Sequence, residues 1–201
     1  MVLDKYRNIS DRLLEPFARP IRQINPNYLS VAALALAVLA GLFFWLSNFC
    51  KAALISASLL VFMSSFFDAL DGRVAKIAKK ETKKGDFLDH VLDRYADVFI
   101  LGGIMLSPYC NPVIGALAII GVLLASYLGT QAQALGLGRE YRGILGRADR
   151  LVILIVVPIT QFLILERIWY FYAVEWMMIY FAIFGNVTAL QRAWHSWRKL
   201  K

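Results

Sequence analysis

The chain alternates long apolar segments with short polar ones, and this pattern predicts most of its structure. Six apolar segments approach the roughly 20 helical residues needed to cross a hydrocarbon core ~30 Å thick. They show little period-two alternation of apolar and polar residues, so we expect a helical bundle rather than a barrel. We place the six segments at Tyr28–Leu46, Ala52–Ala69, Val91–Leu106, Val113–Ala134, Leu151–Leu165 and Trp169–Gln191.

A different pattern precedes the first apolar segment. Between residues 3 and 24, apolar side chains recur every three or four positions and charged residues occupy much of the rest. This pattern is typical of a helix that lies in the headgroup plane, although an ordinary linker is the alternative. Pro16 and Pro20 are expected to bend such a helix. The apolar positions are Leu3, Tyr6, Ile9, Leu13, Phe17, Ile21 and Ile24.

The predicted fold class is therefore an all-α integral membrane protein, with six transmembrane helices preceded by an amphipathic interfacial helix. We expect one domain over residues 1–201, with residues 1–25 as the juxtamembrane helix and residues 26–195 as the bundle. Composition agrees, because 59% of the 201 residues are hydrophobic and only 18% are charged. Soluble domains are about 45–50% apolar and about 25% charged. Cys50 and Cys110 are expected to remain free thiols.

The distribution of positive charge predicts how the chain is oriented. The formal net charge is +8, and all but two of the 22 Lys and Arg residues lie before the first span, after the last, or in and next to the loops after the second and fourth. The exceptions are Lys51 and Arg167. The positive-inside rule then places both termini and these two loops in the cytoplasm of a multi-pass plasma-membrane protein. Because topology and anionic lipids account for the basic excess, no nucleic-acid partner is expected.

Acidic residues are concentrated around the polar loop between the second and third spans. Asp68 and Asp71 are three residues apart, and Asp89 and Asp93 are four apart, so each pair shares one face of a helix. Spans joined by a short turn are expected to be antiparallel neighbours, which lets the two pairs face each other. Four converging carboxylates need cations between them, and oxygen ligands suit Mg²⁺ or Mn²⁺. No His or Cys cluster is present, so zinc is not expected.

Small and basic residues near these acids indicate a phosphate-bearing ligand. Gly72 follows the first pair and Gly85 precedes the second, and the missing side chains allow a ligand to approach the backbone. Cations beside a metal cluster suit a diphosphate, although they are also typical of an inner-leaflet anchor, and either glycine alone could cap a helix. The cations are Arg73, Lys76, Lys79, Lys80, Lys83 and Lys84.

The spacing of these residues resembles the CDP-alcohol phosphotransferase (CDP-alcohol phosphatidyltransferase) family. The matching positions are Asp68, Asp71, Gly72, Ala75, Gly85, Asp89 and Asp93, with Lys76 where the family usually has Arg. The resemblance implies an enzyme that moves a phosphatidyl-type or archaetidyl-type group from a CDP-linked lipid, CDP-diacylglycerol or CDP-archaeol, to an alcohol and releases CMP. It also implies an active site in the cytoplasm and a homodimer.

The same resemblance implies a role for each matching residue. Asp68, Asp71 and Asp89 would bind two metal ions, Mg²⁺ or Mn²⁺. Asp93 would contact the second ion and act as the catalytic base on the incoming hydroxyl. The implied donor-binding residues are Gly72, Arg73, Ala75, Lys76 and Gly85.

The loop after the fourth span bears on the acceptor. Four arginines lie there, and Arg suits phosphate bidentately, so a phosphorylated alcohol is expected unless the charge serves topology alone. Residues 146–151, Gly-Arg-Ala-Asp-Arg-Leu, are similar to the inositol-phosphate-using members of the family. Those members usually have Arg-Ala-Arg-Ala at the end of the fourth helix, whereas residues 131–134 here are Gln-Ala-Gln-Ala, which looks more like archaeal members that build ether lipids. We therefore expect glycerol phosphate, with inositol phosphate as the alternative, bound by Arg139, Arg147 and Arg150.

Two other classes of membrane protein place carboxylates near a bilayer. Membrane prenyltransferases have two well-separated acidic motifs and generally more than six spans, whereas these acids lie within one short stretch. Ion-coupled transporters place charges near the bilayer midplane, often at broken helices. The four aspartates instead lie together at one predicted membrane edge, which favours the transferase.

Overall fold

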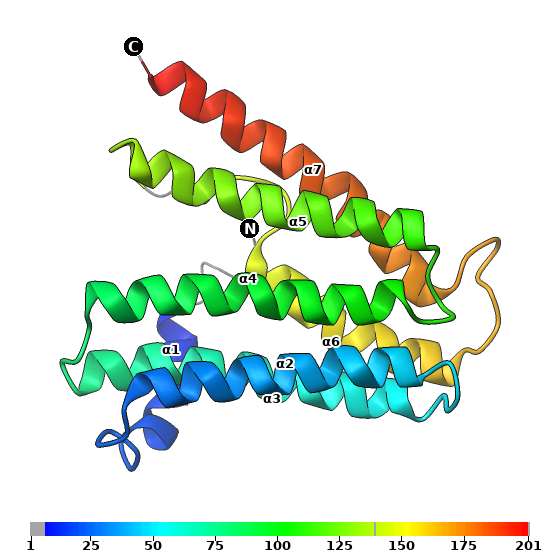
Figure 1. The fold of residues 1–201 in the computed structure, drawn as a ribbon, viewed down its shortest axis with the longest axis horizontal. Helices are drawn as coiled ribbons and strands as arrows, with labels where there is room; N and C mark the ends of the chain where they lie inside the picture. The colour runs from blue at the N-terminus through cyan, green and yellow to red at the C-terminus, as the bar shows by residue number, and fades with distance from the viewer. Residues whose placement is uncertain (1–6, 139, 201) are drawn as a thin grey trace.

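A computed structural model describes residues 7–138 and 140–200, with side chains described from Leu13 onward. The described residues form seven helices and no strand, and the helices lie largely along one direction (Figure 1). The helices are α1 Arg7–Ala18, α2 Pro26–Leu46, α3 Ala53–Ile77, α4 Lys83–Met105, α5 Pro112–Ala134, α6 Arg147–Leu163 and α7 Ala173–Lys199.

Helix starts follow local capping chemistry. Two helices begin with an Asn-Pro pair, in which the Asn side chain accepts a backbone N–H and the Pro occupies the first turn, where its missing N–H costs nothing. Thr82 caps α4 in the same way, because its Oγ1 accepts the Gly85 N–H at 3.0 Å. This cap starts α4 at Lys83, well before the apolar segment expected from Val91.

Four of the six expected spans meet simple criteria of length and hydropathy. Among the described residues, α2, α3, α5 and α7 are long and apolar enough to cross a membrane. Helix α6 has only 17 residues, and the first half of α4 carries the acidic residues and their basic neighbours. Large apolar side chains are exposed along α2, α3 and α5, as expected where lipid covers a helix. The chain is thus a multi-pass membrane protein.

The helices pack in two groups, which are joined by α6 and by direct contact between α4 and α5. Helix α2 packs against both α3 and α4, and α5 packs along α7, while α6 contacts α3 and α7. The three connections α2–α3, α4–α5 and α6–α7 lie at one end of the bundle, and the α3–α4 connection lies at the other (Figure 1). Because α3 and α4 make few direct contacts, residues of both helices line a space between them.

Very close helix contacts hold this frame together. A Cβ atom at Gly103 of α4 would lie 2.1 Å from the Gly41 carbonyl oxygen of α2, so only glycine permits this contact. The buried faces of α2 are otherwise rich in alanine, which also lets helices approach closely. Since α2 contacts both acidic helices, it sets their separation.

The N-terminal helix is shorter than the sequence predicts. The apolar periodicity extends to Ile24, but α1 ends at Ala18, and the chain turns from Arg19 to Asn25 around Pro20. Ala18 and Leu14 pack against Leu70 and Val74 of α3. Leu3 and Tyr6 lie outside the described residues, as does the Ile9 side chain. The position of α1 in a headgroup plane stays a prediction.

Ion pairs and thiols complete the comparison with the sequence. Arg73 donates to Glu15 at 2.7 Å and joins α3 to α1. Hydrogen bonds from Arg19 and Arg73 hold the pKa of Glu15 below its usual range. Cys50 and Cys110 are both free, as predicted.

Candidate active site

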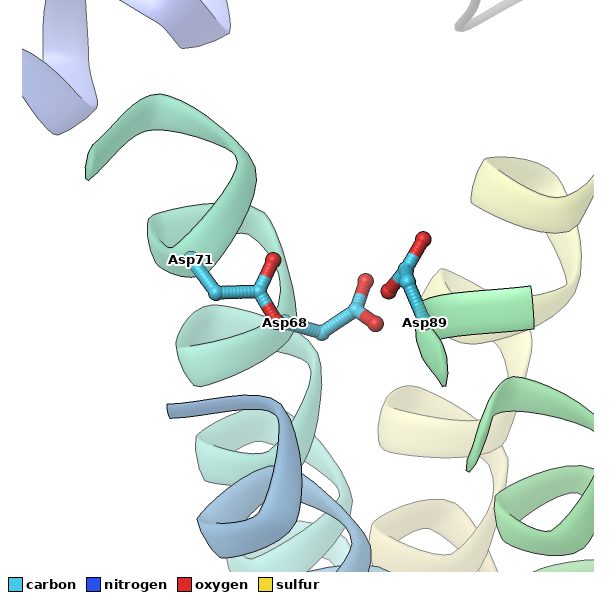
Figure 2. A group of neighbouring side chains, drawn as sticks. All are labelled: Asp68, Asp71 and Asp89. Carbon is cyan, nitrogen blue, oxygen red and sulfur yellow. The ribbon is translucent and has the colours of Figure 1, made fainter. Parts of the chain in front are cut away.

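Three carboxylates from two helices meet at one point. Asp68 and Asp71 extend from α3 and Asp89 from α4, and the three side chains point toward one another (Figure 2). One oxygen from each lies within 4.8 Å of the others, a spacing that fits a shared divalent cation. The donor set is all carboxylate oxygen, which suits Mg²⁺ or Mn²⁺ better than zinc.

The acidic helices face each other without packing closely. The sequence predicts that α3 and α4 are neighbours, but α2 packs against both while they hardly touch each other. Helix α3 continues past the expected end at Ala69 to Ile77, so Asp71 stays on a regular helix. The carboxylates thus face each other across an open space rather than across a helix–helix interface.

Asp93 is not one of these three carboxylates but lies next to Asp68, and its predicted contact with a metal ion stays a prediction. Its carboxylate is buried and both oxygens accept hydrogen bonds from the Arg147 guanidinium, with Nη1 at 2.7 Å from Oδ2. Arg147 also donates to Asp68 at 3.0 Å. The Arg147 guanidinium therefore connects Asp68, one of the three candidate metal ligands, to Asp93. It also fixes the direction in which the Asp93 oxygens point.

A serine that the sequence analysis missed positions one of the acids. The Oγ of Ser30, in the first turns of α2, donates to Asp71 Oδ2 at 2.5 Å, and both residues are buried. A serine inside a helix can donate to the carbonyl four residues before it, and Ser30 Oγ also lies 3.4 Å from the Pro26 oxygen. That local alternative is why its position in an apolar segment gave no signal.

A cavity of about 250 Å³ opens on one side of the carboxylates. We call it the donor-side cavity, because four of the five predicted donor-binding residues line it. A Cβ atom at Gly72 would meet no protein atom within 4 Å, so a ligand has access to the backbone there. Arg73 instead points to Glu15 of α1 and does not line this cavity. The lining includes Asn27, Ser30, Asp71, Gly72, Ala75, Lys76, Lys80, Gly85 and Asp89.

A larger cavity of about 450 Å³ lies on the other side, and we call it the acceptor-side cavity. Three aspartates line it, namely Asp68 and Asp89 from the group of three carboxylates and, in addition, Asp93. Four arginines from three helices also line it, two of which the sequence analysis did not select. The four are Arg94, Arg147, Arg150 and Arg192.

These arginines differ in what they already bind. Arg150 is 5% exposed and donates to both oxygens of Asp97 at 2.8 and 3.0 Å, while its Nε has no protein partner. Arg94 shares Asp97 at 2.9 Å. Arg150 is therefore a buried ion-pair residue that also lines the cavity, and its predicted role as a phosphate ligand stays a prediction. Arg139 lies outside the described residues.

The glutamines that separate this chain from inositol-phosphate-using relatives lie elsewhere. Gln131 and Gln133, near the end of α5, do not line the acceptor-side cavity. Arg192 does line it, from α7, and only 8% of the residue is exposed. The sequence treats Arg192 as one more basic residue near the chain end, so only the packing of α7 on α5 reveals it.

Comparison with known proteins agrees with this geometry. Residues 23–189 match the family model described as CDP-alcohol phosphatidyltransferase. The chain is 30% identical over 200 residues to archaetidylinositol phosphate synthase of Methanothermobacter thermautotrophicus, covering 100% of this chain and 96% of that protein. It is also 30% identical to archaetidylinositol phosphate synthase of Pyrococcus horikoshii, over 89% of this chain and 86% of that one.

Solved structures show the same fold. Mycobacterium tuberculosis phosphatidylinositol phosphate synthase (PgsA1) with CDP-DAG bound superposes with a TM-score of 0.75 at 22% identity, over 92% of this chain and 94% of that one. The same protein in complex with manganese and citrate also gives a TM-score of 0.75, over 92% of this chain and 88% of that one.

Proposed function

The chain belongs to the CDP-alcohol phosphatidyltransferase family, and on that basis we propose that it transfers the lipid phosphate of a CDP-linked lipid to inositol phosphate. The observation that carries this proposal is the acceptor-side cavity, in which four arginines stand beside Asp93. A phosphorylated polyol needs both a cationic pocket and a base near its hydroxyl. The relatives described above are archaetidylinositol phosphate synthases, which supports this acceptor over the expected glycerol phosphate.

The glutamine argument against inositol phosphate loses its force. Gln131 and Gln133 were the reason to prefer glycerol phosphate, but they lie away from the cavity that would hold the acceptor. Arg147 and Arg150, within the segment similar to inositol-phosphate-using members, both line it. We propose Arg147 and Arg192 as the acceptor-phosphate ligands, with Arg150 holding the Asp97 side chain and offering its Nε.

We propose that the donor nucleotide lies in the donor-side cavity. Gly72 and Gly85 leave room near the backbone, and Lys76 and Lys80 supply positive charge for the diphosphate. Asp68, Asp71 and Asp89 would hold the divalent ions, Mg²⁺ or Mn²⁺. When bound, such ions stabilise negative charge on phosphoryl oxygens and on the departing CMP.

In the proposed reaction, the acceptor hydroxyl oxygen attacks the lipid-bearing phosphorus. Asp93 takes the hydroxyl proton, the new P–O bond forms, and the P–O bond to CMP breaks. Arg147 would hold Asp93 in place for this transfer through the bonds to its two oxygens. A positioned base contributes roughly 10²–10⁴-fold to such a rate.

We further propose the topology of this single membrane domain. All six helices α2–α7 would cross the bilayer, with both termini, the α3–α4 connection and the active site in the cytoplasm, as the positive charges predict. The charged half of α4 would then lie at the headgroup level, where the lipid donor presents its diphosphate. The homodimer stays a prediction.

An acceptor panel tests the proposed function. Purified protein in lipid nanodiscs would be given Mg²⁺, CDP-archaeol or CDP-diacylglycerol, and one of inositol phosphate, glycerol phosphate, serine or free inositol. CMP release with inositol phosphate alone is the expected result. Release only with glycerol phosphate would overturn the acceptor and keep the reaction class, whereas release only with serine would overturn the phosphate argument.

A further inference from the structure

One wall of the acceptor-side cavity is an irregular segment. Residues 140–146, which we call the wall segment, lead back from the end of α5 to the start of α6 (Figure 1). Glu140, Tyr141 and Leu145 line the cavity from this segment. A segment without helix or strand keeps its shape only through contacts with its neighbours, so the residues that hold it also shape the cavity.

Those contacts come from one face of α7. Thr188, Arg192, His195 and Lys199 follow one another at steps of four, three and four residues, which places them on one side of the helix. We call these four residues the α7 clamp. They lie on the last turns of a helix that continues beyond its apolar part.

Two members of the α7 clamp bind the backbone. The Leu145 N–H donates to Thr188 Oγ1 at 3.1 Å. Arg192 Nε donates to the Arg142 carbonyl at 2.8 Å, and its Nη1 donates to the Ala125 carbonyl of α5 at 2.5 Å. Arg192 thus ties the wall segment to α5 as well as to α7.

The other two members surround a buried carboxylate. Glu140 is 7% exposed, and its Oε2 lies 3.4 Å from both Lys199 Nζ and His195 Nε2. Its Oε1 accepts the Arg142 N–H at 3.0 Å. Burial by itself raises the pKa of Glu140, but the bonds from Arg142 and Lys199 outweigh it and hold the pKa below its usual range.

The backbone of the wall segment is also shaped to lie against α7. Gly143 has φ +141°, a region that favours glycine, and a Cβ atom there would lie 2.2 Å from Thr188 Cγ2. Such a close approach leaves the segment no room to shift toward α7. Glycine at this position therefore supports the same contact that the polar side chains make.

We propose that the α7 clamp, acting through Glu140 and through the backbone of Arg142 and Leu145, positions the wall segment and so sets the affinity for the acceptor while leaving the affinity for the CDP-linked donor unchanged. This inference rests on the proposed function only in that the acceptor occupies the larger cavity. The donor-side cavity has no residue from α7 or from the wall segment. Lys199 and His195 do not line the acceptor-side cavity, so they are positioning residues and not catalytic residues.

The test removes the outer half of the clamp without touching the cavity lining. In the variant His195→Leu/Lys199→Met, we expect the KM for the phosphorylated acceptor to rise on the order of tenfold, as for one lost hydrogen bond to a charged group. The KM for the donor should stay the same. Hydrogen exchange at the amides of residues 141–145 should become faster.

Arg198→Met is the matched control, because it removes a positive charge from the same turn. Arg198 stacks on Trp194 at 4.9 Å and makes no clamp contact. Unchanged exchange in the double variant, or equal changes in both KM values, would overturn the clamp. If exchange and acceptor KM change as expected but the acceptor used is glycerol phosphate, the clamp stands and the proposed acceptor falls.

Discussion

The two cavities beside the three carboxylates differ in how far apart their lining residues lie in the sequence. The donor-side cavity takes its lining from the start of α2 and from residues 71–89, a short stretch around one helix–loop–helix unit. The acceptor-side cavity takes its lining from α3, α4, α5, the wall segment, α6 and α7. The donor-side cavity is therefore a local structure, and the acceptor-side cavity exists only once the whole bundle has folded.

The two cavities also differ in how their positively charged side chains are held. On the donor side, Lys76 and Lys80 supply positive charge near open space at Gly72. On the acceptor side, arginines are bonded to carboxylates and carbonyls before any ligand enters. Arg suits such fixed, multiple bonds better than Lys does. We infer that acceptor preference can change through the packing of α7 and the wall segment while the chemistry at the aspartates is kept.

The largest effect is expected at the aspartates, two of which line different cavities. Asp71 lines only the donor-side cavity, whereas Asp93 lines the acceptor side. Asp93→Asn should lower CMP release by roughly 10²–10⁴-fold, because the base is lost. Binding of the CDP-linked lipid should persist. In Asp71→Asn, the affinity for Mn²⁺ should decrease, which electron paramagnetic resonance of Mn²⁺ measures. The metal-dependent binding of the donor should be lost as a result. Full turnover in Asp93→Asn would remove that residue from the base role.

A second large effect concerns stability on the acceptor side. Arg150→Met leaves the buried Asp97 with Arg94 alone, and breaking a buried ion pair costs about 3–5 kcal/mol. Thermal unfolding in detergent should show a clear decrease in Tm. The double variant Arg150→Met/Asp97→Asn should recover part of the loss, because the uncompensated charge is gone. Lys84→Met, at an exposed position in the first turn of α4, should leave Tm unchanged.

An intermediate effect is expected at Ser30, which donates a hydrogen bond to the candidate metal ligand Asp71. Ser30→Ala removes the hydrogen bond that orients Asp71, and losing such a supporting bond typically lowers metal affinity by about 10–100-fold. Titration with Mn²⁺ measures this directly, without turnover. The matched control is Ser64→Ala, since Ser64 is equally buried but donates to the Ala33 carbonyl. Equal losses in both variants would contradict a specific role for Ser30.

A smaller effect separates stability from donor binding. Gly72→Ala should stabilise α3 by roughly 0.5–1 kcal/mol, because alanine favours a helix interior and its Cβ meets no protein atom. The same methyl group would occupy the donor-side cavity, so the donor KM should rise about tenfold. Gly102→Ala in α4, whose Cβ also meets nothing, should give the stability gain with unchanged KM.

The smallest effect is a dependence on pH confined to the wall segment. The folded pKa of Glu140 lies below its ordinary value of 4.5, so its contribution to stability is present above pH 4.5 and is lost as pH falls through the folded pKa. Protection factors for amides 141–145 should decrease in this acidic range. The decrease should be absent in Glu140→Gln, and amides around Gly72 should not follow it.

Much of the fold and one side of the site could be predicted because their signals are local. Apolar segments mark helices within a few residues, and three- and four-residue spacing places carboxylates on one face. Helix ends were less accurate, since α3 and α4 continue past their apolar parts and Thr82 supplies the cap that starts α4. Hydropathy indicates which part of a helix is apolar, but it does not indicate the residue at which the helical hydrogen bonds end.

By itself, the sequence determined that this protein is helical, belongs in a membrane and brings Asp68, Asp71 and Asp89 together. It also predicted Asp93 among the metal ligands, and that part stays a prediction. Only the tertiary structure decided that α2 separates α3 from α4, that Ser30 orients Asp71, and that Arg150 pairs with Asp97. It also decided that Arg192 and Glu140 enter the acceptor-side cavity. The physical reason is that side-chain spacing along one helix is set by the backbone, whereas the partner of a buried charge depends on how distant helices pack.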